Sequence, residues 1–285
     1  MAKISRKNKI REGSKVAHTI WFVVLILLIV ICLFPFAYML LMSLIDAKML
    51  RVTLDEIFKS GFTLKNYIKL FKENNYSQYI WNSVLVTAGG VFLACLFGSM
   101  GGYAFAKKKF PGRDGLFLLF LALGMIPTTV LLIPRFLVAR NLGLMNTRVG
   151  LFLPLIAGSG IFLMHQFLKG LPDVLLEAAD IDGCGEFRKF WQIVLPLIKP
   201  VMTTLAITTF TGLWGDLLWP LVMVTDNEKV TLTLAVTTLR KRTEGETKYG
   251  EVFAGYVLTM LPTMIVYMFG QKYFIEGISV SGIKL

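Results

Sequence analysis

Long apolar stretches separated by short polar segments run along this chain. Each of six stretches carries few charges and is long enough to cross about 30 Å of hydrocarbon at ~1.5 Å per helical residue. They lie near residues 19–45, 78–106, 115–134, 150–168, 201–222 and 252–272. The pattern therefore predicts an all-α membrane protein with six transmembrane helices.

The first stretch differs from a secretory signal peptide. It carries no charge from Thr19 to Ile45, whereas the apolar region of a signal peptide spans about 7–15 residues and precedes a small-residue cleavage site. No such site follows here. We expect this stretch to remain as a helix.

Composition supports a membrane protein and excludes several other classes. The 285 residues are 55% hydrophobic and only 17% charged, which is too apolar for an ordinary soluble protein. The net charge of +12 comes from basic residues beside the apolar stretches, so it indicates membrane topology rather than nucleic-acid binding. Cys32, Cys95, Cys184 and the two histidines form no cluster in the sequence, which predicts neither a disulfide framework, nor a metal site, nor a membrane-embedded enzyme.

The basic residues also predict which ends are cytoplasmic. The first fifteen residues hold six Lys or Arg and one acid, and the segment 107–113 (KKKFPGR) packs four cations into seven residues. Short basic loops tend to stay in the cytoplasm. Both termini and the segments 107–114 and 171–200 are therefore expected inside, and the segments 46–77, 135–149 and 223–251 outside.

Outside the six stretches, two polar segments show helical spacing. In the segment 46–77, a short surface helix is predicted by Tyr67, Leu70, Phe71 and Asn74. The segment 171–200 predicts helix, turn, helix: one apolar face is formed by Val174, Ala178 and Ile181, Gly183 breaks the helix, and a second face is formed by Phe187, Phe190, Trp191 and Val194. On periodicity alone, 171–200 is equally compatible with a loop that packs its own aromatic side chains.

Individual residues in the segment 171–200 resemble a known signature. The matching positions are Glu177, Ala178, Ala179, Asp182, Gly183, Ile193, Leu195 and Pro196. In this register they resemble the EAA signature of the membrane subunits of binding-protein-dependent ABC importers. Cys184 departs from it, because the family usually has alanine there. The resemblance implies a pair of coupling helices that dock into a cleft on a cytoplasmic ATPase.

Three predictions concern the second, third and fourth stretches. Small residues recur every four positions in the second, at Gly90, Ala94, Gly98, Gly102 and Ala106. They predict a close contact with another helix of this chain or of a partner, although glycine is also simply common in membrane helices. Pro127 predicts a kink in the third stretch. His165, in the fourth, is expected to be an interfacial histidine with satisfied hydrogen bonds rather than a proton relay.

The fifth stretch is the most polar, and it carries Asp216, the one acid inside a predicted span. Because an ionised carboxylate at the bilayer centre costs ~2.5–3.5 kcal/mol, Asp216 should face protein or water. Thr209, Gly212, Asp216 and Trp219 share one helical arc and are candidates for a solute path. Alternatively, Asp216 bonds a neighbouring helix and Trp219 belongs to the outer aromatic belt.

The sixth stretch offers a second polar stripe, formed by Tyr256, Thr259 and Thr263. It is suited equally to a hydrated solute path and to hydrogen bonds between helices. The end of the chain resembles the tails of maltose-type permeases. The resemblance implies that Ser279, Gly282 and Lys284 contact the ATPase.

Together these observations predict a type I ABC importer permease of the carbohydrate-uptake branch. Three parts are expected: a basic cytoplasmic N-terminus (1–18), a first helix with its outer loop (19–77), and the permease core (78–285). The chain has no phosphate-binding G-x-x-x-x-G-K-[ST] motif, so ATP and Mg²⁺ are expected in a partner ATPase dimer and no cofactor in this chain. The resemblance also implies a second permease subunit and an extracytoplasmic solute-binding protein. The alternative is an ion-coupled secondary transporter, and the solute stays open among saccharides, polyols and glycerol phosphates.

Overall fold

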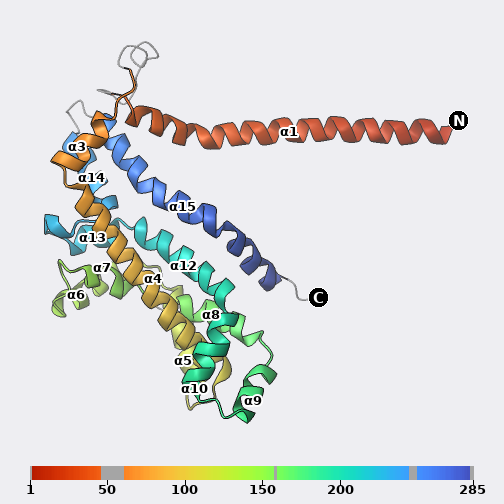
Figure 1. The fold of residues 1–285 in the computed structure, drawn as a ribbon, viewed down its shortest axis with the longest axis vertical. Coiled ribbons are helices and arrows are strands. Elements are labelled where there is room, and N and C mark those ends of the chain that lie inside the picture. The colour runs from red at the N-terminus through yellow and green to blue at the C-terminus, as the bar shows by residue number, and fades with distance from the viewer. Residues whose placement is uncertain (1, 46–60, 157–158, 244–248, 283–285) are drawn as a thin grey trace. The chain divides into compact units, whose positions relative to one another are not determined.

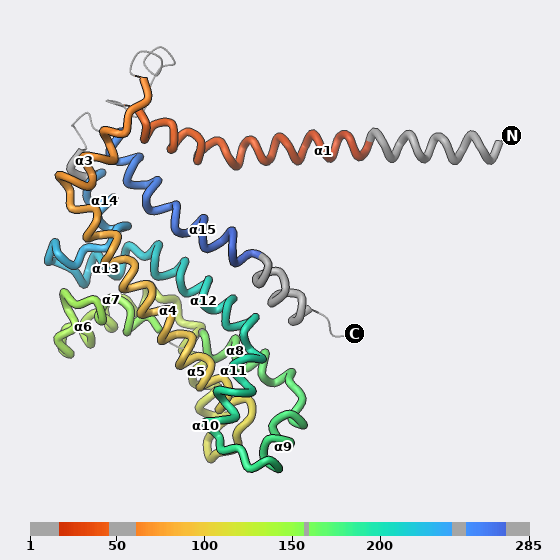
Figure 2. The backbone as a smooth tube through the Cα atoms, in the orientation of Figure 1, coloured from red at the N-terminus to blue at the C-terminus, as the bar shows by residue number. Residues whose placement is uncertain are grey.

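The structure is a computed structural model. It describes the backbone of residues 2–45, 61–156, 159–243 and 249–282, and the side chains of 17–45, 61–156, 160–240 and 249–271. Within these ranges every regular element is helical (Figures 1 and 2). The chain divides into two compact units, Met1–Leu70 with Arg242–Val257, and Phe71–Lys241 with Leu258–Leu285.

The first unit joins the end of α1 (Ala2–Ser43) to α3 (Lys65–Glu73) and to the start of α15 (Tyr249–Gly282). The predicted short helix of segment 46–77 is present as α3, and its place on the outer membrane surface stays a prediction. Asn66 is buried and donates from Nδ2 to the carbonyl oxygens of Ser43, at 2.9 Å, and Ile45, at 2.8 Å. These bonds satisfy carbonyls at the C-terminal end of α1, where no helical N–H can reach them.

The second unit is built around α4 (Tyr76–Lys107), which packs against α8 (Ser159–Lys169) and α12 (Lys199–Trp214) (Figure 1). Its small residues allow this approach. A Cβ added at Gly90 would collide with Leu213 of α12, and one added at Gly102 would collide with Met164 of α8. The predicted close helix contact is therefore confirmed, and it is made within this chain.

The other helices of the second unit are short. They are α5 (Arg113–Met125), α6 (Leu132–Asn141), α7 (Arg148–Phe152), η1 (Leu153–Leu155), α9 (Val174–Ile181), α10 (Glu186–Lys189), the π-helix η2 (Phe190–Val194), α11 (Leu195–Leu197), α13 (Leu218–Met223), η3 (Asn227–Lys229) and α14 (Leu232–Thr243). In Figure 1, α9 and α10 lie near one end of α4, and α13 lies near the other.

The third predicted span is broken rather than kinked. α5 ends at Met125, and Ile126 is extended, with φ −74° and ψ 124°. The residue before a proline is pushed out of the helical region by the proline ring, and Pro127 follows directly. The helix resumes only at Leu132, so the prediction of one kinked helix over 115–134 was wrong.

Two further predicted spans are interrupted. In the fourth, a bend separates Arg148–Leu155 from Gly160–Lys169. A 78° bend between Glu186–Leu197 and Lys199–Trp214 precedes the fifth, which is itself interrupted after Trp214. α12 then stops at Trp214, so Asp216 lies in a break before α13 and not on a continuous helix. Helices that are long and apolar enough to span a membrane singly are Ala17–Ser43, Tyr76–Lys107 and Tyr249–Gln271. With each bent pair counted as one span, the described residues offer up to five.

Candidate functional site

The polar segment 171–200 forms two short helical pieces joined by a tight turn near the end of α4 (Figure 2). α9 ends at Ile181, and Gly183 has φ 72°, in the left-handed region that favours glycine. The N–H groups of Gly183 and Cys184 donate to the carbonyls of Asp180, at 3.0 Å, and Ala179, at 2.9 Å. These bonds cap the C-terminus of α9, as expected for a helix that ends at a left-handed glycine.

The residues that match the signature are spread over this loop. Ala179 is buried, Ile193 and Leu195 are half-buried, and the others are exposed: Glu177, Ala178, Asp182, Gly183 and Pro196. Most of the signature therefore lies at the surface of this subunit. The geometry alone assigns none of these residues a partner protein.

The apolar residues of the loop face two ways. Phe190 and Val194 are buried with Tyr103, Leu168 and Ile198 in one core cluster, which fastens the second helical piece to α4 and α8. The rest of the predicted apolar faces is exposed, with exposed fractions of 68% for Val174, 88% for Ile181 and 73% for Phe187. Together with Leu175 and Trp191 they form an exposed apolar surface. The aromatic side chains of the loop nevertheless contact one another, as the alternative interpretation expects: the Trp191 ring centroid lies 5.9 Å from that of Phe187 and 5.6 Å from that of Phe190.

A network of charges joins the loop to the end of α4. The Lys189 side chain is only 2% exposed, and its Nζ pairs with Asp180 and with Oε1 of Glu186, at 2.8 Å. The other oxygen of Glu186 lies 2.5 Å from Nζ of Lys108 and accepts from the Tyr103 hydroxyl at 3.2 Å. One carboxylate therefore bridges a cation beside α4 and a buried cation inside the loop.

A second link reaches the first turn of α9. Lys107, at the end of α4, donates from Nζ to the carbonyl of Leu171 and to the carboxylate of Asp173, both at 2.6 Å. Both links use residues of the segment 107–113, which sequence reasoning used only for topology. The signal available was the run of three acids followed by two bases over 180–189, but nothing in it indicates Lys107 or Lys108 as partners.

The network shifts the ionisation of its members. Hydrogen bonds from Lys108 and then Lys189 lower the pKa of Glu186 from 4.5 to about 2. Hydrogen bonds to Asp180 and then Glu186 raise the pKa of Lys189 above its ordinary 10.5. Both groups are therefore charged throughout the physiological range, and the links are permanent near neutral pH.

A cavity of about 530 Å³ lies in the second unit, among α6, η1, α8, α12, α13 and the segment that follows α5. All four candidate residues of the fifth stretch line it: Thr209, Gly212, Asp216 and Trp219. Sequence reasoning missed other polar groups on the same wall, namely Thr128, Thr129, Arg135 and Thr208. The signal for Thr128 and Thr129 was their place after Pro127, but the chain break that turns them toward the cavity was not foreseen.

Trp219 forms part of the cavity wall, and its ring is almost completely buried. Only 2% of it is exposed, and its indole N–H donates to the carbonyl of Gly150 at 2.9 Å. The carboxylate of Asp216 accepts from the backbone N–H of Trp219 at 3.4 Å and so covers the start of α13. This satisfies a backbone N–H that the break leaves without an intrahelical partner.

The stripe on the sixth stretch is placed differently. Thr259 and Thr263 belong to the same unit as the cavity but are not part of its lining, and Tyr256 belongs to the first unit. The carbonyl of Thr259 accepts from the indole N–H of Trp214 at 2.8 Å, which joins α15 to α12. Of the tail residues, the side chains of Ser279 and Gly282, and all of Lys284, lie outside the described residues.

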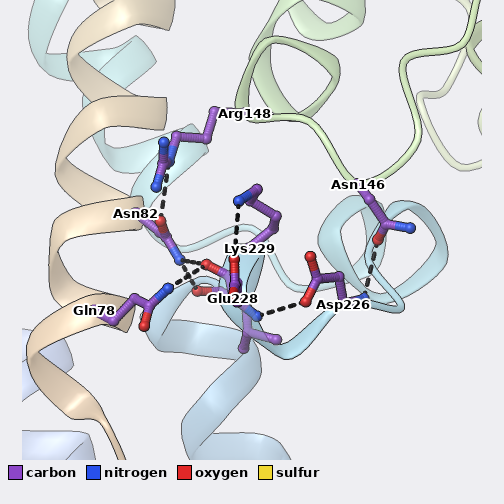
Figure 3. Close-up of polar contacts among 8 residues, drawn as sticks. Gln78, Asn82, Asn146, Arg148, Asp226, Glu228 and Lys229 are labelled. Carbon is purple, nitrogen blue, oxygen red and sulfur yellow. Dashed lines mark hydrogen bonds and ion pairs between the residues drawn. The ribbon is translucent and has the colours of Figure 1, made fainter.

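At the other end of α4, Asn82 organises the loop that leads into α14. It is fully buried, and Figure 3 shows it between Arg148 and Glu228. Its Nδ2 donates to the carbonyls of Glu228, at 2.8 Å, and Val230, at 2.9 Å, and its Oδ1 accepts from Nε of Arg148 at 3.0 Å. Gln78 donates to the same Glu228 carbonyl at 2.9 Å.

Titratable side chains elsewhere provide no reactive centre. Among the described residues, no group of three or more His, Cys, Asp or Glu side chains could hold a metal ion. His165 stacks on Phe117 with ring centroids 4.0 Å apart, and its buried Nδ1 lacks a hydrogen-bond partner in the structure. The prediction of a fully satisfied histidine was therefore wrong.

Comparison with known proteins identifies the family. The model of the family described as binding-protein-dependent transport system inner membrane component matches residues 90–280, which is more than half of the chain. The chain is 38% identical to the arabinooligosaccharides transport system permease protein of Halalkalibacterium halodurans over 258 residues, covering 89% of this chain and 92% of that protein. It is 36% identical to the sn-glycerol-3-phosphate transport system permease protein of Yersinia pestis over 195 residues, 68% of each chain.

A solved structure has the same fold. It is a bacterial ABC transporter involved in the import of the acidic polysaccharide alginate, and it superposes with a TM-score of 0.80 at 22% identity, covering 92% of this chain and 98% of that one. The helical core around α4 is therefore a permease fold. On the family match and the two relatives, the chain belongs to the binding-protein-dependent transport system inner membrane components.

Proposed function

We propose that this chain is one permease subunit of an ABC importer that moves a carbohydrate-type solute into the cell. ATP and Mg²⁺ are bound and used by a separate ATPase dimer, and an extracytoplasmic solute-binding protein delivers the solute. Family membership makes the chain a membrane component rather than an enzyme, and it disfavours an ion-coupled secondary transporter. The saccharide class is proposed by analogy with the relative that belongs to an arabinooligosaccharide transport system.

The observation that carries the proposal is the loop 171–200. Its signature residues and its apolar residues are exposed, while Phe190, Val194 and Lys189 fasten it to the end of α4. An exposed apolar surface on a rigidly held loop is suited to docking in a cleft of another protein. We assign that role to contact with the ATPase, with Ser279, Gly282 and Lys284 of the tail as further contacts.

Topology and partners complete the proposal. Six spans are proposed. The break in the third is exposed on this chain, so it needs cover from another subunit or from water, because irregular backbone is not tolerated against lipid. The basic N-terminus, the segment 107–114, the loop 171–200 and the tail are assigned to the cytoplasm. A second, homologous permease subunit is proposed to cover the apolar residues that α5 and α6 expose, among them Leu118, Met125 and Ile133.

Co-purification and uptake test this function together. The tagged chain is expressed with its chromosomal neighbours in a host that lacks its own saccharide importers. The probes are arabinotriose, maltotriose and sn-glycerol 3-phosphate. We expect the chain to capture an ATPase and a second permease, and uptake of at least one probe to require the binding protein and an intact phosphate-loop lysine in the ATPase. A chain that purifies alone, with uptake abolished by a protonophore but not by loss of ATP hydrolysis, would contradict the proposal.

A further inference from the structure

The cavity in the second unit carries exactly one cation and one anion among its described wall residues. Arg135 comes from α6, and Asp216 comes from the break between α12 and α13. The two side chains act on each other electrostatically but do not form an ion pair. The two side chains carry opposite charges and line the same cavity, so the charges of the described wall residues sum to zero.

The Arg135 guanidinium is available to a ligand. It makes no hydrogen bond or ion pair with another residue in the described part of the chain, although its side chain is only partly exposed. Guanidinium offers five N–H donors and no acceptor. A cation facing a cavity inside a membrane protein is costly unless water or solute pairs with it, which makes it a functional group by default.

Hydroxyl groups complete the wall. The hydroxyls of Thr128, Thr129 and Thr209 have no partner among the described residues, whereas the Thr208 hydroxyl donates to the carbonyls of its own helix. Three free hydroxyls, one carboxylate and one guanidinium therefore face the same space. Such a wall offers donors and acceptors in similar number.

We propose that this cavity accepts an uncharged polyhydroxylated solute and discriminates against anionic ones, with Arg135 and Asp216 as the paired determinants. The proposal rests on the importer function proposed above and narrows its substrate class. Each sugar hydroxyl both donates and accepts, so one solute can donate to Asp216 and accept from Arg135. A phosphate or uronate would gain from Arg135 but would meet the Asp216 carboxylate in the same cavity, without a second cation to offset it.

The charge of the cavity can be measured without knowing the solute. A parent chain has Cys32, Cys95 and Cys184 replaced by alanine and carries Thr209→Cys on the cavity wall. The complete importer is placed in nanodiscs, so that reagents reach it from both sides. Labelling rates are compared for anionic sulfonatoethyl, cationic trimethylammonioethyl and neutral hydroxyethyl methanethiosulfonates. A cysteine at the exposed Asn227 gives the intrinsic reactivity of each reagent.

In the parent, we expect the normalised anionic and cationic rates at position 209 to agree within about threefold. A cavity of this volume is roughly 10 Å across if spherical. One unit charge at that distance changes a rate by on the order of tenfold when the effective dielectric constant is about 20. Relative to the neutral reagent, the anionic rate should therefore rise about tenfold in Asp216→Asn and fall about tenfold in Arg135→Gln, with the cationic rate changing in the opposite direction.

Three results would each overturn the proposal. A parent ratio already about tenfold in favour of the anionic reagent would identify an anion-accepting cavity. Unchanged ratios in both variants would show that the two charges do not act on its contents. Failure of the neutral reagent to label position 209 would show that partner side chains fill the space. Because labelling needs no transport, an importer that shows the expected ratios but takes up none of the probes would contradict only the proposed function.

Discussion

The ammonium nitrogen of Lys108 lies 2.5 Å from Oε2 of Glu186. Lys108 is the first residue after α4, and Glu186 begins α10, so this ion pair joins the loop 171–200 to the longest helix of the second unit. The other oxygen of Glu186 holds the buried Lys189 at 2.8 Å. Movement of the loop relative to α4 must separate at least one of these pairs, so force applied to the loop reaches α4 while the pairs hold.

Replacing Lys108 should weaken the transmission of force from the loop 171–200 to α4. In Lys108→Met, the loop loses its outer ion pair while its apolar core contacts remain, so we expect insertion to be normal and uptake to fall about 5- to 10-fold. Lys109→Met is the matched control, because Lys109 is exposed and makes no ion pair in the described structure. Uptake and the ratio of ATP hydrolysis to transport are measured in the purified importer. Equal losses in both variants would attribute the effect to the charge of the segment and not to this pair.

The same pair predicts a dependence on acid pH. Glu186 has its pKa lowered from 4.5 to about 2 by hydrogen bonds from Lys108 and then Lys189, so its contribution is present above pH 4.5 and is lost as the pH falls toward 2. Glu186 is more than half exposed, so solvent screens the interaction and the effect is modest. The difference in melting temperature between the native permease and Glu186→Gln should stay constant from pH 8 to pH 5 and shrink below pH 4.5. If the difference in melting temperature were instead largest at acid pH, the lowered pKa of Glu186 would be contradicted.

Gly183 should resist substitution because of its backbone and not because of crowding. Its φ is 72°, and no heavy atom lies within 4 Å of an added Cβ. A left-handed conformation costs an ordinary L residue about 1–2 kcal/mol. The Gly183→Val permease should therefore have a lower melting temperature, and its ATP hydrolysis should be uncoupled from uptake. Gly183→Asn should cause smaller changes in both, because asparagine tolerates the left-handed region.

Gly185 provides the matched control for Gly183. It has an ordinary φ of −64° and equally open space around it. Gly185→Ala should leave the melting temperature and uptake close to those of the native permease. If Gly185→Ala and Gly183→Val cause the same loss, the surface of the loop, rather than its turn, is responsible.

Local periodicity was enough to predict some of these features. The four-residue spacing of small residues on α4 predicted its close contacts, because one helix face sets that distance wherever its partner lies. Gly183 likewise predicted the turn between α9 and α10. Both features depend on residues a few positions apart, which a sequence pattern records directly.

Other features depend on residues far apart or on competing local effects. The pair of Lys108 and Glu186 joins two distant segments, and neither segment shows a pattern that points to the other. Pro127 was visible, but whether a helix bends or stops there depends on how the next four residues turn. Asp216 was expected on a helix face, and it lies instead at the break between α12 and α13, while Arg135 reaches the same cavity from α6, far away in the sequence.

The assignment of sides is tested with two surface positions in the second unit. Asp114 lies in the first turn of α5, beside the basic segment 107–113, and Asn227 lies in η3, which packs against α4; both are exposed. In intact cells, Asn227→Cys should react with an impermeant thiol reagent and Asp114→Cys only after the membrane is opened. The reverse pattern would invert the topology and remove the ATPase assignment of the loop 171–200.

Asn82 should control the opening of the loop that contains Lys229, which the proposed topology assigns to the outside. Asn82→Ala removes the amide that holds the carbonyls of Glu228 and Val230, and it also removes the acceptor of Arg148 (Figure 3). Leaving the Val230 carbonyl and the Arg148 guanidinium without this partner costs about 1–3 kcal/mol, which raises the open population by roughly 5- to 150-fold. Trypsin cleavage after Lys229, followed in spheroplasts, should accelerate about tenfold or more.

Gln78→Ala is the matched control for Asn82, because Gln78 donates to the same Glu228 carbonyl from an exposed position. Cleavage there should rise less than about threefold, since Asn82 still holds both carbonyls and water can replace the lost donor. Asn82→Asp separates the two halves of the Asn82 side chain. It keeps an acceptor for Arg148 but turns a carboxylate oxygen toward two carbonyls, so it should open the loop as much as Asn82→Ala does. If Asn82→Asp instead protects Lys229 like the native residue, the bond to Arg148 alone holds the loop, and the amide donors of Asn82 have no such role.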